Sequence, residues 1–223
     1  MFYLESHIMY LKKRKTTIFL IMICIVAILI VAININYTIA FNSKKKCIYT
    51  YGVIDGHLSK SHKNLSKTAN VRYEKNTTHG DKILNMMKEY SRDVKVYYYD
   101  ARNNEKFSSE EILKGLEWMK KNQVRYVSIS LSSKFYSKEV QNWISTNKNC
   151  ITIYASYNNE LNTLDYPAKY MDVIGVGASK KIEKKKEDII VKSNKIILIS
   201  DGLKFYNGNS FLTPYIMLHD TIK

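Results

Sequence analysis

The sequence predicts an α/β protein with three layers, α/β/α, in which a mostly parallel central sheet lies between two layers of helices. Short apolar runs alternate along the chain with amphipathic stretches, and most of these runs are apolar throughout. Strands that are buried on both faces have this character, and alternating strands and helices are typical of parallel sheets. With 45% hydrophobic and 25% charged residues in a chain of 223, the composition indicates one folded domain with an appendage.

A hydrophobic segment near the N-terminus is expected to cross a membrane as a helix. Residues 18–33 form an unbroken apolar run, and no charged residue follows before Lys44. This stretch supplies the roughly 20 residues that a helix needs to span a bilayer. The expected organisation is a basic cytoplasmic N-terminus at 1–16, a transmembrane helix at 17–41, a basic linker at 42–46 and the folded domain at 47–223.

Basic residues on either side of this helix predict its orientation. Four Lys and Arg residues lie at 12–15 and three lysines at 44–46, and cytoplasmic flanks carry the excess of positive charge. We therefore expect a cytoplasmic N-terminus and an extracytoplasmic domain, at a bacterial cell membrane. A cleaved signal peptide is the alternative. The long apolar run, which no clean small-residue cleavage site follows, favours an uncleaved anchor.

The net charge of +15 narrows the classes of partner. Part of it comes from the first 46 residues, which hold seven Lys and Arg residues and one Glu, and part from the lysine-rich run Lys180–Lys186. No nucleic-acid-binding motif accompanies this charge. We therefore interpret Lys180–Lys186 as a solvated basic loop and expect no nucleic-acid partner.

No metal ion or cofactor is expected. The cysteines Cys24, Cys47 and Cys150 have no spacing to histidines that is typical of zinc sites. Asp100 and Glu105 are too few for a calcium ion, which takes roughly six to eight oxygen ligands, unless backbone carbonyls supply most of them, and the sequence leaves calcium binding open. Cys47 and Cys150 would both lie outside the cytoplasm, and the sequence leaves open whether they pair or remain thiols.

Each expected strand is a short apolar run that ends at polar or turn-forming residues. The first strand, Cys47–Ile54, ends at Asp55 and Gly56, a turn signal. Further strands are expected at Val94–Tyr98, Val124–Leu131, Ile151–Ala155 and Val173–Ala178, with two more apolar runs at Asp188–Val191 and Lys195–Ser200.

Three helices are expected between these strands. The first begins at Thr78, which has the spacing of a capping box with Asp81 and precedes apolar residues that recur on one face. The second begins at Ser108 or Ser109, with acidic residues first and lysines last, as the helix dipole favours. The third covers Lys138–Thr146.

A fourth helix is expected at the end of the chain, and it begins near Ser210. The side chain of Asn209 or Ser210 is expected to cap this helix, with Pro214 in its first turn. Ser210 is also a candidate nucleophile, because the dipole at a helix N-terminus favours negative charge. The two roles do not exclude each other.

Four polar residues lie in short motifs that follow one another along the chain, namely Asp55, His79, Asn159 and Ser210. These motifs are Val53–Gly56, Thr78–Gly80, Tyr154–Glu160 and Asn207–Pro214, and they are accompanied by Gly115–Trp118, Val127–Leu131, Tyr166–Tyr170 and Val173–Ala178. In this order they resemble the motifs of the subtilisin-like serine proteases, the subtilase or peptidase S8 family. The resemblance covers nearly all of the chain after the expected membrane helix. It implies a subtilisin-like fold in a short, divergent, membrane-anchored member.

The resemblance also implies a role for each residue of the site. Ser210 would be the nucleophile of a serine endopeptidase that forms an acyl-enzyme, and His79 would be its base. Asp55 would orient the imidazole, and Asn159 would donate to the oxyanion. The expected substrate is a peptide or protein whose backbone would pair with Ser130, Leu131 and Ser132.

Some residues depart from the family pattern. Asp81 stands where the family usually has Thr, and Asn158 and Ser132 each replace a Gly. These departures motivate an alternative function, that of a catalytically impaired pseudoprotease that binds a peptide or protein partner without cutting it. His57 and His62 are not expected to act as the base, because neither opens a helix next to a glycine.

Overall fold

The computed structural model describes residues 21–26, 38–41, 49–91, 93–103, 106–158, 165–177, 186, 188–190, 196–199 and 204–222. The chain divides into two compact units, Met1–Thr38 and Ile39–Lys223. In the first unit, residues 21–26 are helical. The described ranges include no helix of the length and apolarity needed to cross a bilayer. Most of the predicted transmembrane segment lies outside these ranges, and its last four residues, Thr38–Phe41, form strand β1 instead of helix.

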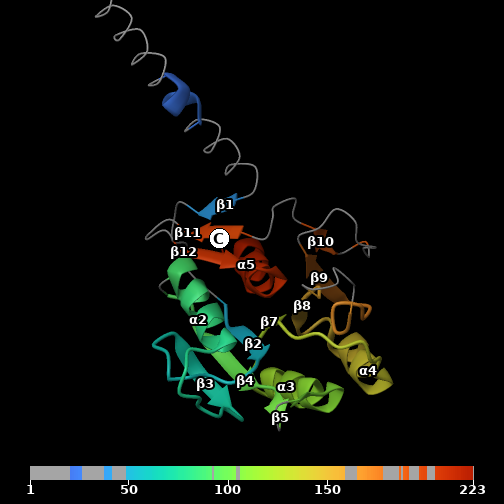
Figure 1. The fold of residues 1–223 in the computed structure, drawn as a ribbon. Helices are drawn as coiled ribbons and strands as arrows, with labels where there is room; N and C mark the ends of the chain where they lie inside the picture. The colour runs from blue at the N-terminus through green and yellow to red at the C-terminus, as the bar shows by residue number, and fades with distance from the viewer. Residues whose placement is uncertain are drawn as a thin grey trace, which may run out of the picture. The chain divides into compact units, whose positions relative to one another are not determined.

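A seven-stranded parallel sheet forms the centre of the second unit, which confirms the predicted fold class (Figure 1). The strand order is β10-β9-β8-β7-β2-β4-β3, and every neighbouring pair is parallel. The bounds are β2 Tyr51–Asp55, β3 Leu65–Ala69, β4 Val96–Asp100, β7 Tyr126–Ile129, β8 Thr152–Ser156, β9 Val173–Gly177 and β10 Ile189–Ile190.

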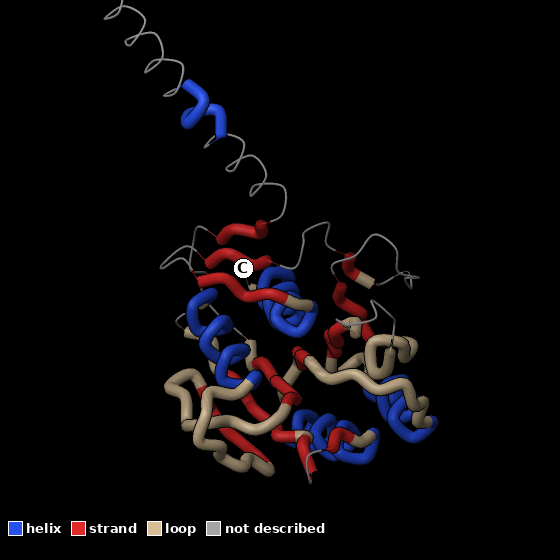
Figure 2. The backbone as a smooth tube through the Cα atoms, in the orientation of Figure 1, coloured by secondary structure: helices blue, strands red, loops and turns tan. Residues whose placement is uncertain are grey.

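Helices cover both faces of this sheet, as Figures 1 and 2 show. Helices α2 (His79–Tyr90) and α5 (Asn209–Thr221) pack on one face, and α3 (Ser109–Lys121) and α4 (Lys138–Asn147) on the other. Each pair shares a separate hydrophobic core with the strands. Because successive strand side chains point to opposite faces, each apolar strand contributes to both cores.

The elements that the sequence did not predict are short and carry little apolar pattern. Strand β3 is largely exposed at the edge of the sheet. Strands β5 (Arg102–Asn103) and β6 (Lys106–Phe107) form a small antiparallel hairpin after β4. Strand β12 (Lys204–Asn207) pairs antiparallel with β11 (Ile196–Ile199) in a three-stranded sheet that includes β1.

The order of the strands places the end of β2 at a topological switch point. After β2 the chain runs to the edge strand β3, returns through α2 to β4, and then crosses through α3 to β7 on the opposite side of β2. The connections that follow the neighbouring strands therefore diverge there, and ligand sites of open α/β sheets form in this crevice. Asp55 is the last residue of β2 and stands at this position.

The cysteines do not form a described disulfide. Cys150 is a free and exposed thiol, and Cys24 is also exposed. Cys47, with which Cys150 was a candidate to pair, lies outside the described residues.

Gly80 in the first turn of α2 is required by close packing against β4. A Cβ atom at this position would overlap the hydroxyl oxygen of Tyr98. That hydroxyl is fully buried and donates to the carbonyl of Gly56 at 2.6 Å, so it has little freedom to move.

We therefore expect Gly80→Ala to lower the free energy of unfolding by about 1–3 kcal/mol, the usual cost of overpacking a core. Urea unfolding followed by tryptophan fluorescence measures this change. Gly56→Ala is the matched control, because its added Cβ would make only an ordinary 3.6 Å contact with Phe107. Equal effects of the two substitutions would contradict the packing argument.

Candidate active site

Asp55 and His79 form a hydrogen-bonded pair at the carboxyl edge of the sheet. His79 Nδ1 lies 2.8 Å from Asp55 Oδ2. Asp55 Oδ1 accepts the backbone N–H of Gly56 at 2.7 Å, so both carboxylate oxygens have a donor. The Asp55 residue is 2% exposed, whereas the side chain of His79 is 40% exposed. The structure therefore brings these two predicted site residues together, with the carboxylate inside and the imidazole facing solvent.

The position of His79 follows from the way α2 begins. Thr78 is the N-cap, and its hydroxyl accepts the backbone N–H of Asp81 while the Asp81 carboxylate accepts the backbone N–H of Thr78. This is the capping box that the sequence predicted. His79 is consequently the first residue of the helix and projects from its N-terminal turn toward the end of β2.

The environment of His79 raises its pKa above the ordinary value. Burial is the largest influence and lowers the pKa, because it disfavours the charged imidazolium. The hydrogen bond to Asp55 and the charge of that carboxylate together outweigh burial, while the charge of Lys82 acts in the lowering direction. The imidazole thus gains a proton more readily than a free histidine, which suits a group that accepts a proton during a reaction.

A cleft of about 310 Å³ lies in front of this pair. Four residues predicted from the sequence contribute to its lining, namely Asp55, His79, Ser130 and Leu131. Gly56 and Thr78 belong to the predicted motifs around Asp55 and His79, whereas His57, Glu74, Arg102 and Phe107 were not predicted to line a site. Ser132 is exposed and is not one of the lining residues.

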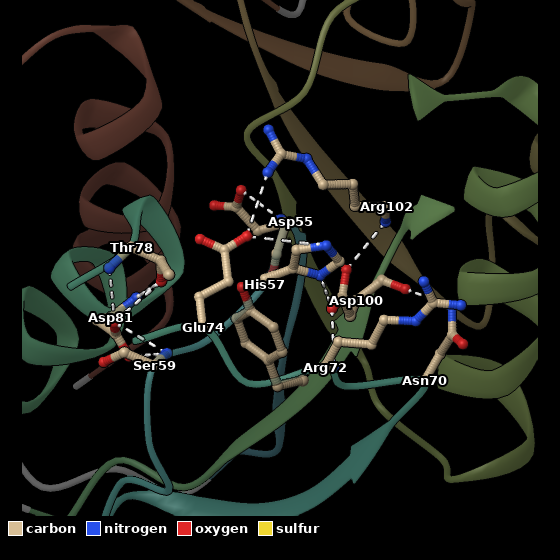
Figure 3. A network of polar contacts seen from close by, with 12 residues as sticks. Asp55, His57, Ser59, Asn70, Arg72, Glu74, Thr78, Asp81, Asp100 and Arg102 are labelled. Carbon is tan, nitrogen blue, oxygen red and sulfur yellow. Dashed lines mark hydrogen bonds and ion pairs between the residues drawn. The ribbon is translucent and has the colours of Figure 1, made fainter. Parts of the chain in front are cut away.

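Three of these lining side chains, His57, Glu74 and Arg102, belong to a network of polar contacts that Figure 3 shows. His57 Nδ1 lies 2.5 Å from the buried Asp100 carboxylate, and its Nε2 lies 3.8 Å from Glu74. Glu74 in turn lies 3.5 Å from Arg102 of the β5–β6 hairpin. The pair of asparagines that follows Arg102 in the sequence is a turn signal and could have indicated this hairpin.

Ser210 is the second residue of α5, and the predicted side-chain cap of this helix is wrong. The N-cap is Gly208, which makes no side-chain capping bond, and neither Asn209 nor Ser210 occupies that position. Gly208 has φ 114°, a conformation that favours glycine. Ser210 therefore lies in the first turn of the helix, where backbone N–H groups point outward and favour negative charge.

Pro214 links the start of α5 to the strand that lines the cleft. It lies inside the helix, in the second turn and not the first, and a proline has no N–H to donate to the carbonyl four residues before it. That carbonyl belongs to Ser210, and it accepts the hydroxyl of Ser130 at 2.8 Å. Ser130, predicted to bind substrate through its backbone, thus also holds the turn that carries Ser210.

A second contact joins α5 to the histidine. The ring of Phe211, the residue after Ser210, lies 5.3 Å from the ring of His79. Asn159, the predicted oxyanion donor, lies outside the described residues. Its neighbour Asn158 donates to Asp165 at 2.9 Å. Within the described part of the chain, no group of three or more His, Cys, Asp or Glu side chains could hold a metal ion.

Fold and site together define an α/β protein with an imidazole–carboxylate pair at the switch point of a parallel sheet and a serine in the first turn of the last helix. A family model described as the subtilase family (Peptidase_S8) matches residues 69–202, more than half of the chain. The chain belongs to the subtilase family of serine peptidases. The matched residues include His79, whereas Asp55 and Ser210 lie outside them.

One curated relative agrees with this assignment. Subtilisin BL of Lederbergia lenta is 25% identical over 135 residues, which are 55% of this chain and 49% of that protein. The chain thus spans about half the length of this curated relative.

Solved structures show the same fold. The prenylagaramide maturation protease PagA has a TM-score of 0.58 at 16% identity, over 76% of this chain and 72% of that chain. A lanthipeptide protease has a TM-score of 0.56 at 15% identity, over 78% of this chain and 72% of that chain.

The pKa of His79 provides a test of the geometry that does not depend on activity. In the unsubstituted protein, we expect the His79 ring to titrate above the ordinary histidine value of about 6.5. Asp55→Asn removes the carboxylate charge and leaves only an uncharged acceptor for the ring N–H, while burial and Lys82 still lower the pKa, so the midpoint should fall. NMR titration of the ring protons measures the midpoint, with His79→Gln to assign the resonance. A midpoint that stays high in Asp55→Asn would refute the assigned cause.

Proposed function

We propose that the protein is a serine endopeptidase that cuts a peptide or protein through an acyl-enzyme. The observation that carries this proposal is the hydrogen-bonded Asp55–His79 pair, whose imidazole lies against the residue that follows Ser210. A base oriented by a carboxylate, close to a hydroxyl at a helix N-terminus, is the arrangement that nucleophilic catalysis by serine requires.

In the first half of the proposed reaction, Ser210 Oγ attacks the carbonyl carbon of the peptide bond. His79 accepts the hydroxyl proton on Nε2, because its Nδ1 faces Asp55. The Asp55 carboxylate stays ionised, holds the tautomer and stabilises the imidazolium that forms. The raised pKa of His79 favours this transfer. The imidazolium then gives the proton to the leaving amine, and an acyl-enzyme remains.

In the second half, water replaces the amine. His79 accepts a proton from the water as it attacks the acyl carbon, and returns it to Ser210 Oγ as the ester bond breaks. The oxyanion of both tetrahedral intermediates needs hydrogen-bond donors. The side chain of Asn159 and the backbone N–H groups at the start of α5 are the donors we propose, each worth about 3–4 kcal/mol of transition-state stabilisation by comparison with other such sites.

Substrate would enter as an extended chain. Ser130 and Leu131 follow β7 and line the cleft, where their backbone is expected to pair with the substrate backbone as an added strand, together with the exposed Ser132. The hydroxyl of Ser130 is already engaged by the carbonyl of Ser210, so we assign only backbone contacts to substrate at this position.

Labelling by a fluorophosphonate probe tests the proposal in the full-length protein. We expect Ser210 to be labelled, and Ser210→Ala to remove the label. His79→Ala should lower peptide hydrolysis by more than about 10³-fold, as for other members of such triads.

Because His79 must be neutral to accept a proton, kcat/KM should rise with pH through a midpoint above the ordinary histidine value. A folded protein that neither takes the label nor cleaves peptides, yet binds them, would instead be the pseudoprotease considered above.

We also propose that residues 17–37 anchor the protein in a bacterial cell membrane, with the domain outside the cytoplasm. The uncharged, apolar sequence supports this proposal.

In a bacterial host, the protein should remain in the membrane fraction after an alkaline wash, and protease added to spheroplasts should digest the domain. Ile25→Lys combined with Leu29→Lys should release it, because each lysine costs about 3 kcal/mol at the centre of a bilayer. The matched control is Ile25→Leu with Leu29→Ile. A native protein found in the soluble fraction would refute the anchor.

A further inference from the structure

The carboxylate of Asp81 has more hydrogen-bond donors than a helix cap needs. Oδ1 accepts the backbone N–H of Ser59 at 3.1 Å and lies 2.7 Å from His62 Nε2. Oδ2 accepts the backbone N–H of Thr78 at 2.7 Å and its hydroxyl at 3.0 Å, and shares the Ser59 N–H at 3.1 Å. Figure 3 shows the Ser59 and Thr78 contacts meeting at this one side chain. Of these bonds to the carboxylate, a capping box accounts only for the one from the backbone N–H of Thr78.

These donors come from the two segments that carry the imidazole–carboxylate pair. Thr78 directly precedes His79, and Asp81 lies two residues after it. Ser59 and His62 belong to the loop that leaves β2 directly after Asp55. Asp81 therefore joins the segment of the base to the segment of the carboxylate that orients it.

The charge and burial of Asp81 indicate that this junction is strong. Asp81 is 0% exposed, and the side chain of His62 is 5% exposed. Burial acts to raise the pKa of Asp81, but the bonds from Ser59, Thr78 and His62 overcome it and hold that pKa well below its ordinary value. Asp81 is thus ionised in the folded protein, and hydrogen bonds to an ionised acceptor are stronger than neutral ones.

The chemistry of the donor set explains why an aspartate stands here. A threonine, the usual residue of the family at this position, has one hydroxyl oxygen with two lone pairs. It would not reach four donors on two segments, whereas a carboxylate has about four acceptor positions. The departure at Asp81, which suggested an impaired site, is therefore accompanied by partners that match it.

We propose that Asp81 and His62 are positioning residues that fix the base His79 relative to Asp55. This inference rests on the proposed function. His62 does not act on substrate, because its ring is buried and its Nε2 faces Asp81. Its role is to hold the loop after Asp55 against the first turn of α2, so that the 2.8 Å bond between Asp55 and His79 keeps its length and direction.

Two variants of His62 separate this role from the charge of Asp81. His62→Leu removes the donor but keeps the carboxylate, so any change at His79 must arise from altered geometry. His62→Gln restores a side-chain N–H that can reach Asp81. Asp81→Asn keeps the shape of the side chain and replaces one acceptor by a donor. His219→Gln is the control, because this histidine is half exposed in the last turn of α5.

The first readout is the NMR titration of the His79 ring, which needs no catalytic activity. We expect the midpoint to fall in His62→Leu and Asp81→Asn, because a misaligned bond to Asp55 raises the pKa less. It should remain at the unsubstituted value in His62→Gln and His219→Gln. The second readout is peptide hydrolysis, in which kcat should fall by roughly 10–100-fold in the first two variants while KM changes little. Circular dichroism confirms that each variant is folded.

The outcomes separate the two proposals. If the protein cuts no peptide but the titrations shift as expected, the positioning role stands and the proposed function fails. If the protein cuts peptides and folded His62→Leu and Asp81→Asn match the unsubstituted protein in both readouts, the positioning role is overturned. A rise in KM at constant kcat, or a loss in His62→Leu that His62→Gln does not reverse, would also overturn it.

Discussion

The hydrogen bond between Asp55 and His79 depends on how two segments far apart in the fold's connectivity are held against each other. Asp55 ends a buried strand, and His79 begins a helix that the chain reaches only after visiting the edge of the sheet. The sheet fixes the first residue and the capping box fixes the second. The separation between them is then set by the loop after β2, which Asp81 and His62 tie to the helix. The sheet, the helix cap and the contacts of Asp81 thus all contribute to the distance between Asp55 and His79.

The same region contains an unusual concentration of buried negative charge. Asp55, Asp81 and Asp100 are each 2% exposed or less, and each is paired with a different histidine. The hydroxyl of Tyr98 lies among them, where burial first and then the charges of the three carboxylates raise its pKa well above the ordinary value. It therefore remains a neutral donor to Gly56. An unpaired carboxylate would be costly at this depth, so the three histidines are part of what makes the region stable.

The parts of this architecture that the sequence predicted are those with a strong local pattern. The apolar runs around Val53, Val127 and Val176 became central strands, and the Thr78 cap became the start of α2. The wall of the cleft was not predictable in the same way, because Glu74 and Arg102 are ordinary surface residues until a turn and a hairpin bring them together. The cap of α5 was assigned incorrectly because Asn and Ser are good caps in general, whereas here a glycine with positive φ turns the chain.

The start of α5 shows how a helix-breaking residue can serve a site. Pro214 has no N–H to donate to the carbonyl of Ser210, one turn before it in the helix. The hydroxyl of Ser130 supplies the missing bond and in doing so joins the last helix to the strand end that lines the cleft. This donor comes from the segment expected to hold substrate. The side chain of Ser130 thus fixes the first turn of α5 relative to the strand end at the cleft, before any ligand is present.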